Sequence, residues 1–538
     1  MPAPLDSPSP GLYTWDKTKT LVDTIEDVRS RYSALPAYSQ QGKTLSYEEM
    51  VRLSRNVASY LQNHPELKVG DRVAVQTPNT LYYPVIAWGI LQAGMVIVNL
   101  NPQYTATETE RQLKDADVRA WFCADISAHL IEPVRVHLNC PVVVVCRLFE
   151  LHSFAKRNIF QFVLEHRKKA IKPYARKNLL SFQKVLREGA RRKWVKPKLD
   201  ANDLAMLQYT GGSSGVHMGA MLTHANLVAN MEQVNHFLSD GIETGKEILI
   251  APLPIYHIFS FTVHCAASLL SGCHNILILD ASNMATLLAE LKRWKFTIVT
   301  GVNTLFFALM RMSSFATVDF SSFKFAIAGG MKLDPQVAEK WQKLTGGPIL
   351  EGFGMTELSP VASWNPRHDN RLGTIGKPMP QTEMRLTDAN ERVIDVPGVS
   401  GELWVRGPQV MVGYWGKKDQ TESHIDKEGW MRTGDLASFD QDNYWKIIGR
   451  KKRMILVSGF NVYPVEVEKA LKSHPDIEDA LVVGRTHPVN GEAVKAYIIP
   501  KKQGLVASDI RDFLKKDLTS YKLPKQLEFV ESFPKAEF

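Results

Sequence analysis

The sequence predicts an α/β protein with parallel-type sheets wrapped by helices, followed by a small β-rich section and a compact α+β section. Three observations support this fold class. Short apolar runs alternate with segments of helical spacing, the pattern changes near residue 380, and 538 residues suffice for more than one domain. Apolar residues make up 44% and charged residues 22% of the chain, which is typical of globular proteins and argues against disorder.

The alternation begins with an expected strand at 71–76, a helix at 79–93 and a strand at 95–98. It returns at 247–251, 258–270, 276–279, 284–294, 296–300, 304–311, 324–328 and 335–344. Continuous apolar strands separated by helices imply parallel sheets covered on both faces. The most apolar stretch, 84–100, is too short and too interrupted by polar residues for a membrane-spanning helix, so it is predicted to be core.

Beyond residue 380, the segments 383–387 and 401–405 alternate polar and apolar residues between Pro/Gly turns, which predicts strands. A basic cluster at 450–453 then precedes a compact pattern of both strands and helices. Its expected elements are strands at 454–457, 479–483 and 493–499 and helices after Pro464 and at 508–516. We therefore predict an N-terminal domain at 1–449, a hinge at 450–453 and a C-terminal domain at 454–538.

The formal net charge of +9 is unevenly distributed. Residues 156–198 hold fifteen Lys and Arg but two acidic residues, so this segment carries +13 and the rest of the chain −4. Interleaved apolar residues predict helix-like amphipathicity and a basic surface that meets anionic membrane lipid. A solvated helical excursion is the alternative. No helix-turn-helix, zinc or RNA-binding signature accompanies the charge, so we expect no nucleic-acid partner.

Five irregularly spaced cysteines without a C-x-x-C motif argue against a disulfide framework or a zinc site and for a reduced cytoplasm. Residues 1–11 lack the basic and apolar regions of a signal peptide. The expected location is therefore cytoplasmic, and peripheral on the inner face of the cell membrane. A homodimer is left open.

A first motif at 209–219 combines three aliphatic hydroxyls with four glycines. Glycines let the backbone approach a ligand closely, and successive N–H groups form an anion-binding concavity. The motif is not a Walker A loop, because the following Lys-Ser/Thr is absent. Taken alone, it is equally consistent with phosphate binding and with a flexible surface loop.

Two further motifs follow. In the segment 351–357, Phe353 suits stacking on a base, Thr356 suits a phosphate and Glu357 suits Mg²⁺. Asp435, at a turn, and Arg450, fifteen residues later, suit the hydroxyls of a ribose. Taken singly, the segment 351–357 is more typical of an ordinary strand-to-helix turn with a capping Thr. Asp435 and Arg450, taken alone, are more typical of an Asx-type turn followed by a solvated charge run.

In this order, the three motifs resemble the adenylate-forming (ANL) superfamily, and most closely its bacterial long-chain fatty acid–CoA ligases. The resemblance runs from 45–47 to 534–535 and includes the stretches 253–259, 300–306, 401–415 and 454–464. It implies a large adenylation domain with acyl and ATP sites and a small mobile C-terminal domain. It also implies that a fatty acid, Mg·ATP and coenzyme A give acyl-CoA, AMP and pyrophosphate through an acyl-adenylate.

The resemblance implies a role for each matching residue. Three would be catalytic: His257 near the reacting carboxylate, Thr356 at the α-phosphate and Glu357 at the Mg²⁺. Lys452 would be the hinge residue, and Ser458, Gly459 and Phe460 would bind CoA. The implied ATP-binding residues are Thr210, Gly211, Gly212, Ser213, Ser214, Gly215, Gly219, Gly329, Gly330, Gly352, Phe353, Gly354, Met355, Thr356, Asp435 and Arg450.

The sequence departs from the family pattern at three places. Met218, beside His217, replaces the lysine of the phosphate loop, Arg453 replaces an acidic hinge residue, and the sequence ends before the family's Gly-Lys. Because cations stabilise phosphoryl transfer, we expect impaired adenylation. The alternative is a weak or inactive homologue that binds acyl chains or nucleotide as a regulatory protein. Aryl-CoA ligases and fatty acyl-AMP ligases are the neighbouring enzyme classes.

Overall fold

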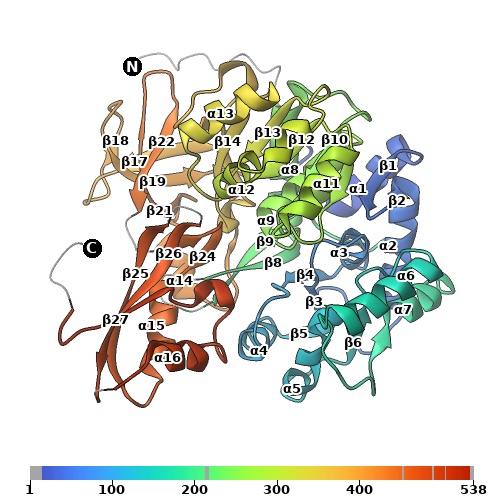
Figure 1. Cartoon of the computed structure of the whole chain (residues 1–538). Coiled ribbons are helices and arrows are strands. Elements are labelled where there is room, and N and C mark those ends of the chain that lie inside the picture. The colour runs from blue at the N-terminus through green and yellow to red at the C-terminus, as the bar shows by residue number, and fades with distance from the viewer. Residues whose placement is uncertain (1–14, 212–216, 451–453, 488–489, 503, 534–538) are drawn as a thin grey trace.

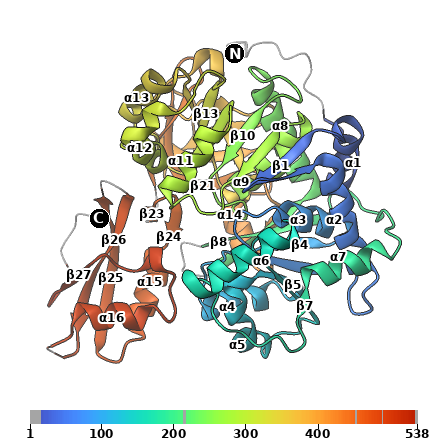
Figure 2. The same ribbon diagram turned by 45° about the vertical axis from the view of Figure 1, so that its right-hand side comes forward.

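A computed structural model describes residues 15–211, 217–450, 454–487, 490–502 and 504–533 (Figure 1). These residues form four sheets, three from residues up to Arg450 and one from residues after it. The fourth sheet and its helices lie beside the larger part, as the turned view shows (Figure 2). The predicted boundary at 450–453 begins at the last residue of β22 (Trp445–Arg450) and precedes β23 (Ile455–Val457), and its last three residues lie outside the described residues.

An eight-stranded sheet has the order β20-β9-β8-β4-β3-β5-β6-β7. Its strands are β3 (Arg72–Gln76), β4 (Val96–Asn99), β5 (Val118–Ala124), β6 (Val142–Cys146), β7 (Leu180–Ser181), β8 (Leu204–Gly211), β9 (His217–Thr223) and β20 (Gly413–Tyr414). Helices α2 (Tyr47–Gln62), α3 (Tyr82–Gln92), α4 (Ala106–Asp115), α5 (Ile131–Arg135), α6 (Phe154–Phe162) and α7 (Phe182–Ala190) belong to this region.

A nine-stranded sheet has the order β16-β15-β14-β13-β12-β10-β11-β1-β2. Its strands are β1 (Pro36–Gln40), β2 (Lys43–Ser46), β10 (Ile248–Ala251), β11 (His274–Leu277), β12 (Ile298–Gly301), β13 (Phe325–Ala328), β14 (Ile349–Gly354), β15 (Val361–Trp364) and β16 (Lys377–Pro378). The helices are α1 (Leu21–Tyr32), α8 (His224–Ser239), α9 (Ile258–Ser260), α10 (Ser268–Leu270), α11 (Met284–Arg293), α12 (Asn303–Met310) and α13 (Pro335–Thr345).

The smaller sheets match the predicted β-rich and α+β sections. The third contains β17 (Glu383–Thr387), β18 (Val393–Ile394), β19 (Gly401–Arg406), β21 (Met431–Phe439) and β22 (Trp445–Arg450), with α14 (Lys418–His424) nearby in sequence. The fourth contains β23 (Ile455–Val457), β24 (Phe460–Val462), β25 (Ile477–His487), β26 (Gly491–Pro500) and β27 (Gln526–Phe529), with α15 (Pro464–Lys472) and α16 (Ala507–Leu514).

The predicted α/β class is confirmed, but the two large sheets are mixed rather than wholly parallel. Six adjacent strands of each are parallel, whereas β9 pairs antiparallel with β8, and β15 pairs antiparallel with β14. The reason is the short connection in each pair, because a parallel partner needs a crossover of a dozen or more residues. The first two of the three sequence motifs lie at these short connections.

The apolar stretch at 84–100 is buried throughout, as predicted for core. Every residue of α3 is buried, since its helix is packed on all sides rather than on one face. Within the described part of the chain, no helix combines the length and apolar character needed to cross a membrane.

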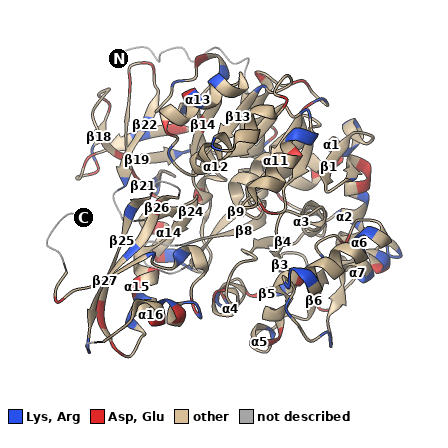
Figure 3. Ribbon diagram, viewed as in Figure 1, with Lys and Arg blue, Asp and Glu red and all other residues tan. Residues whose placement is uncertain are grey.

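The basic segment 156–198 is only partly helical, which corrects the expected amphipathic pattern. After α6 the chain continues as π-helix at Val163–Arg167, but 168–179 is irregular before β7 and α7. Phe182 is fully buried in the core, so it does not face solvent. Lys and Arg gather along α6 and α7 (Figure 3). Three exposed apolar side chains belong to α6, namely Phe154, Ile159 and Phe162 at 74%, 63% and 56% exposure, and Val195 near the end of the segment is also exposed.

Candidate active site

Most of the predicted site residues line one cavity. The full lining is Thr210, His257, Ile258, Phe259, Ile327, Ala328, Gly329, Gly330, Gly352, Phe353, Gly354, Met355, Thr356, Glu357, Pro360, Val361, Trp364, Arg450, Gly459, Asn461 and Tyr463. Residues separated by more than 200 positions in the chain therefore meet. Asn461 and Tyr463 were not singled out from the sequence, although they lie in the matching stretch 454–464.

Three antiparallel hairpins deliver the three motifs to this cavity. The first motif joins β8 to β9, the second spans the end of β14 and the turn into β15, and the third lies on β21 and β22. The second motif is thus a strand-turn-strand unit with a short 3₁₀ turn at Thr356–Leu358. In the first two hairpins the motif lies at the turn, where side chains and backbone groups are free for a ligand. In the third, Asp435 and Arg450 pair at the end of the hairpin opposite its turn.

Glu357 is a buried carboxylate in the cavity wall. The hydroxyl of Tyr414 donates a hydrogen bond to its Oε1 at 2.8 Å. Burial raises the pKa of Glu357, and the Tyr414 hydrogen bond opposes this only in part. The described residues contain no cluster of three metal-ligating side chains. One carboxylate nevertheless suits Mg²⁺, which is commonly held by one or two carboxylates together with substrate phosphates and waters.

Asp435 and Arg450 are cross-strand partners on β21 and β22, which explains their separation of fifteen residues. Arg450 Nε lies 2.7 Å from Asp435 Oδ1. Arg450 lines the cavity, whereas Asp435 is buried behind it. Burial raises the pKa of Asp435, and the charge of Arg450 opposes the rise. The pair therefore presents one positioned guanidinium to the cavity.

Three of the predicted glycines illustrate different structural reasons for having glycine at a position. A Cβ on Gly354 would lie 2.1 Å from the carbonyl oxygen of Pro360, so no larger residue fits. Gly330 has a positive φ of 76° and faces open space. Gly219 lies outside the cavity lining, and its missing side chain makes room for the ring of Tyr209, which would lie 3.1 Å from a Cβ at this position. Its predicted contact with ATP stays a prediction.

His257 forms the N-cap of α9, where Nδ1 accepts a hydrogen bond from the Phe259 N–H at 3.4 Å. Its side chain has access to the cavity, but protein surrounds the cavity and this desolvation lowers the pKa of His257 to about 4. The imidazole is therefore neutral near pH 7. It offers a hydrogen bond to a carboxylate without adding a positive charge.

The predicted CoA-binding residues come from the turn between β23 and β24. Gly459 lines the first cavity, while Ser458 and Phe460 line a second cavity of about 450 Å³. Opposite them are residues of the large domain, among them Tyr256 and Leu305. The second cavity is thus an interdomain space that adjoins the first.

A charged cluster between the domains was not predicted. Lys522, with 2% of its side chain exposed, lies 2.7 Å from Glu108 and 2.9 Å from Glu466. Glu466 Oε1 also lies 3.3 Å from His217 Nε2, and Thr519 donates to Glu108 at 2.6 Å. Each domain contributes one carboxylate and one basic group, because Glu108 and His217 belong to the large domain. No local motif signals this cluster, since its members lie up to 414 positions apart.

Several predicted residues lie outside the described residues or outside the cavity lining. Gly212, Ser213, Ser214, Gly215 and the predicted hinge residue Lys452 lie outside the described residues, as does Arg453. Gly211 ends β8, opposite His217. Met218 is 5% exposed and packs into the core of the large domain, on the opposite side of the strand from His217. Among the described residues of this loop, no basic side chain lines the cavity.

Two family models match the chain. The model of the AMP-binding enzyme family matches residues 25–415, and that of the AMP-binding enzyme C-terminal domain matches residues 466–537. A long-chain-fatty-acid–CoA ligase of Salmonella typhimurium is 42% identical over 522 residues, which are 97% of this chain and 93% of the relative. The enzyme of that name from Bacillus subtilis is 32% identical, with 96% of this chain and 92% of the relative covered.

Solved structures show the same fold. An amide bond synthetase from Marinactinospora thermotolerans has a TM-score of 0.81 at 22% identity, with 95% of this chain and 96% of that chain covered. ATP-bound MatB from Rhodopseudomonas palustris has a TM-score of 0.67 at 26% identity, with 96% of both chains covered. The first likeness supports the architecture alone.

Proposed function

The chain belongs to the AMP-binding enzyme family, and we propose that it is an ATP-dependent, AMP-forming long-chain fatty acid–CoA ligase. The observation that carries the proposal is the meeting of three motif hairpins at one cavity, in a chain 42% identical to a curated enzyme of this activity. The alternative of a non-catalytic binding protein is not favoured, because the relatives carry a ligase name.

The proposed reaction has two steps. The fatty carboxylate attacks the α-phosphorus of ATP, forming the acyl-adenylate while the bond to pyrophosphate breaks. The CoA thiol then attacks the acyl carbonyl, forming the thioester and releasing AMP and the thiol proton. Such transfer depends mainly on positioning and on stabilisation of charge. Thr356 and Arg450 supply donors for nucleotide oxygens, and neutral His257 orients the carboxylate without a competing ion pair.

Mg²⁺ would be held by Glu357 together with the phosphates. When bound, it would neutralise phosphate charge. Glu357 fits this role because the hydrogen bond from Tyr414 offsets only part of the cost of burying its negative charge. A bound cation would compensate the rest of that charge. The second cavity suits the pantetheine arm of CoA, since Ser458 and Phe460 form one of its walls.

The acyl chain needs an apolar wall beside His257. Phe259 lines the first cavity, and Leu305 lines the second. By contrast, Phe261, Phe306 and Leu309 are fully packed in the core. The apolar runs that contain these residues therefore contribute to the acyl site only in part.

The proposal is tested by acyl-CoA formation with ATP, Mg²⁺, CoA and fatty acids of increasing length. Activity on long chains is expected, and activity confined to aryl acids or the arrest of the reaction at the acyl-adenylate would contradict it. ATP binding without acyl-adenylate formation would instead identify a binding protein.

We further propose that adenylation is the slower half-reaction, because Met218 replaces the loop lysine and His217 is held by Glu466. Each 1.36 kcal/mol of lost transition-state stabilisation slows a step about tenfold. Release of pyrophosphate from oleate and ATP should therefore be slow and should quicken in Met218→Lys. Thioester formation from supplied acyl-adenylate should be unaffected. Rapid pyrophosphate release by the unaltered chain would contradict this.

We propose a peripheral position on the inner face of the cell membrane, through the basic segment 156–198. Support comes from the exposed Phe154, Ile159 and Phe162 of α6, which lie among basic residues. Apolar side chains that enter the interface and cations that face anionic lipid act together in such surfaces. Neutralising Arg167, Lys168, Lys169 and Lys172 should weaken liposome binding and leave nucleotide binding intact. Unchanged liposome affinity would refute the proposal.

A further inference from the structure

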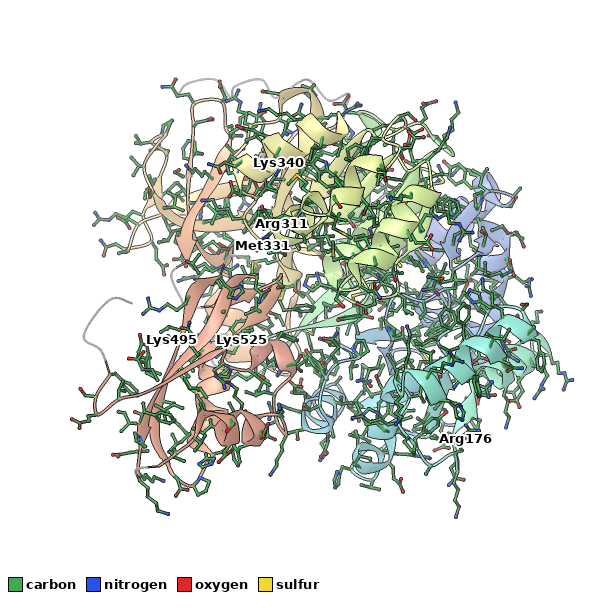
Figure 4. The ribbon with its side chains drawn as sticks, viewed as in Figure 1. Arg176, Arg311, Met331, Lys340, Lys495 and Lys525 are labelled. Atoms are coloured by element: carbon green, nitrogen blue, oxygen red, sulfur yellow. The ribbon has the colours of Figure 1, made fainter. Side chains whose placement is uncertain are left out.

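A separate cavity of about 320 Å³ lies at the far edge of the eight-stranded sheet, away from the catalytic cavity. Three arginines line it, Arg147 after β6, Arg157 on α6 and Arg176 in the irregular stretch before β7. Arg176 lies on the side of the molecule opposite Lys495 of β26 and Lys525, which precedes β27 (Figure 4). No step of the proposed reaction uses this cavity.

The charges around the cavity are not balanced. Its one lining carboxylate, Glu150, is buried, with Oε2 accepting a hydrogen bond from the Arg147 backbone N–H at 2.9 Å and Oε1 lying 3.4 Å from Arg157 Nη1. Among the described residues, no carboxylate lies within ion-pair distance of Arg147 or Arg176. The buried Nε of Arg157 also has no hydrogen-bond partner there. Three guanidinium groups thus face one carboxylate.

The position of the cavity in the fold also favours an anion. It lies beyond the carboxyl end of the parallel strand β6, where α/β sheets commonly bind ligands. Ser181 and Gln183 in its wall belong to the N-cap and first turn of α7, where unpaired N–H groups carry partial positive charge. Planar guanidinium groups match phosphate oxygens in geometry as well as in charge.

The cavity adjoins the exposed apolar face of α6. The guanidinium of Arg157 lies 5.6 Å from the ring centroid of Phe154, which is among the most exposed apolar side chains. A phosphate in the cavity would therefore lie next to side chains suited to enter a lipid interface.

We propose that this cavity binds a phosphate mono- or diester, with Arg147 and Arg176 as the principal ligands. The phosphate belongs either to the headgroup of an anionic phospholipid or to a phosphorylated small molecule. The first source rests on the proposed membrane surface, and the second does not.

The test compares the full chain with Arg147→Gln/Arg176→Gln and with the control Lys168→Gln/Lys169→Gln. Both variants lose two positive charges from the same region of the fold, but Lys168 and Lys169 are exposed and do not line the cavity. One arm measures calorimetric binding of glycerol 3-phosphate. The other measures co-sedimentation with vesicles of equal parts phosphatidylcholine and phosphatidylglycerol. Acyl-CoA formation from oleate without vesicles tests the ligase proposal separately and should be unchanged in both variants.

Binding of glycerol 3-phosphate that weakens at least tenfold in the arginine variant, but less than twofold in the control, supports a phosphorylated small molecule. Vesicle affinity that falls at least tenfold further in the arginine variant than in the control supports a phospholipid headgroup. Equal behaviour of the two variants in both arms, or absence of binding by the unaltered chain in both, overturns the proposal.

Discussion

Glu357 and Glu466 are both buried glutamates, one in the wall of the catalytic cavity and one between the domains, yet their pKa values move in opposite directions. Burial raises the pKa of Glu357, and the hydrogen bonds from Tyr414 and from its own backbone N–H, together with more distant charges, oppose the rise only in part. Burial would also raise the pKa of Glu466, but the hydrogen bond to His217 and the charge of Lys522 lower it to about 2. Among the described residues, no basic group forms an ion pair with Glu357, whereas Glu466 pairs with His217 and Lys522. We call Glu357 with Tyr414 the incomplete cluster, and Glu108, Glu466, His217 and Lys522 the complete cluster.

The largest effect is expected from removing the cation of the complete cluster. Lys522→Met leaves Glu108 and Glu466 buried without their ammonium partner, which should cost about 3–5 kcal/mol of stability. The midpoint of thermal unfolding should fall, and tryptic cleavage between the domains should accelerate. Lys515→Met, which removes an exposed lysine paired with Asp512, is the control and should change stability by less than about 1 kcal/mol. Equal midpoints for both variants would show that the cluster does not hold the domains together.

The second largest effect is expected at Glu357 in the incomplete cluster, where a substitution should lower activity rather than stability. Glu357→Gln should slow acyl-CoA formation by about 10²–10³-fold, because one positioned electrostatic group of a transfer site is lost. Its thermal stability should be maintained, since the substitution removes a buried negative charge. Glu351→Gln is the matched control, because this buried carboxylate lies in the preceding strand but not in the cavity lining. Equal losses of activity in both variants would contradict the assignment.

The pH dependence of stability should separate the two clusters. Because the pKa of Glu466 is about 2 in the folded protein, against an ordinary value of 4.5, its contribution is complete above about pH 4.5. It should be lost as the pH falls toward 2, by about 3 kcal/mol in all, since each tenfold change in proton affinity is worth about 1.4 kcal/mol. Glu357, with a raised pKa, acts in the opposite sense, so its stabilising contribution falls as the pH rises.

The measurement is acid unfolding of the chain and of Glu466→Gln. The variant should lose stability at pH 7 and show a flatter decline between pH 4.5 and pH 2. An unaltered decline would show that other carboxylates dominate acid unfolding.

The smallest effect tests a glycine of the first motif that faces the core. Gly219→Ala should cost about 1 kcal/mol, because the new Cβ would crowd the ring of Tyr209. The Michaelis constant for ATP should change little, since Gly219 does not line the cavity. A strong loss of ATP affinity at unchanged stability would instead support the nucleotide contact predicted from the sequence.

The sequence motifs predicted many of the residues that line the cavity, but not the charged cluster between the domains. Thr210, Phe353 and Arg450 were found because each lies within a short motif whose residues act together through one hairpin. Asp435 does not line the cavity and pairs with Arg450, which does, so its predicted contact with the ribose stays a prediction. The direction of a side chain relative to its strand partner depends on register, which a local pattern does not reveal.

The sequence by itself determined the α/β class, the positions of most strands and helices, the family and the motif residues of the catalytic cavity. Periodicity and turn chemistry are local properties, and they act over a few residues. Only the tertiary structure decided that β9 and β15 are antiparallel and that Glu108 meets Lys522 and Glu466 across the domains. Those contacts join distant segments, so their energies depend on how the sheets and domains pack rather than on neighbouring residues.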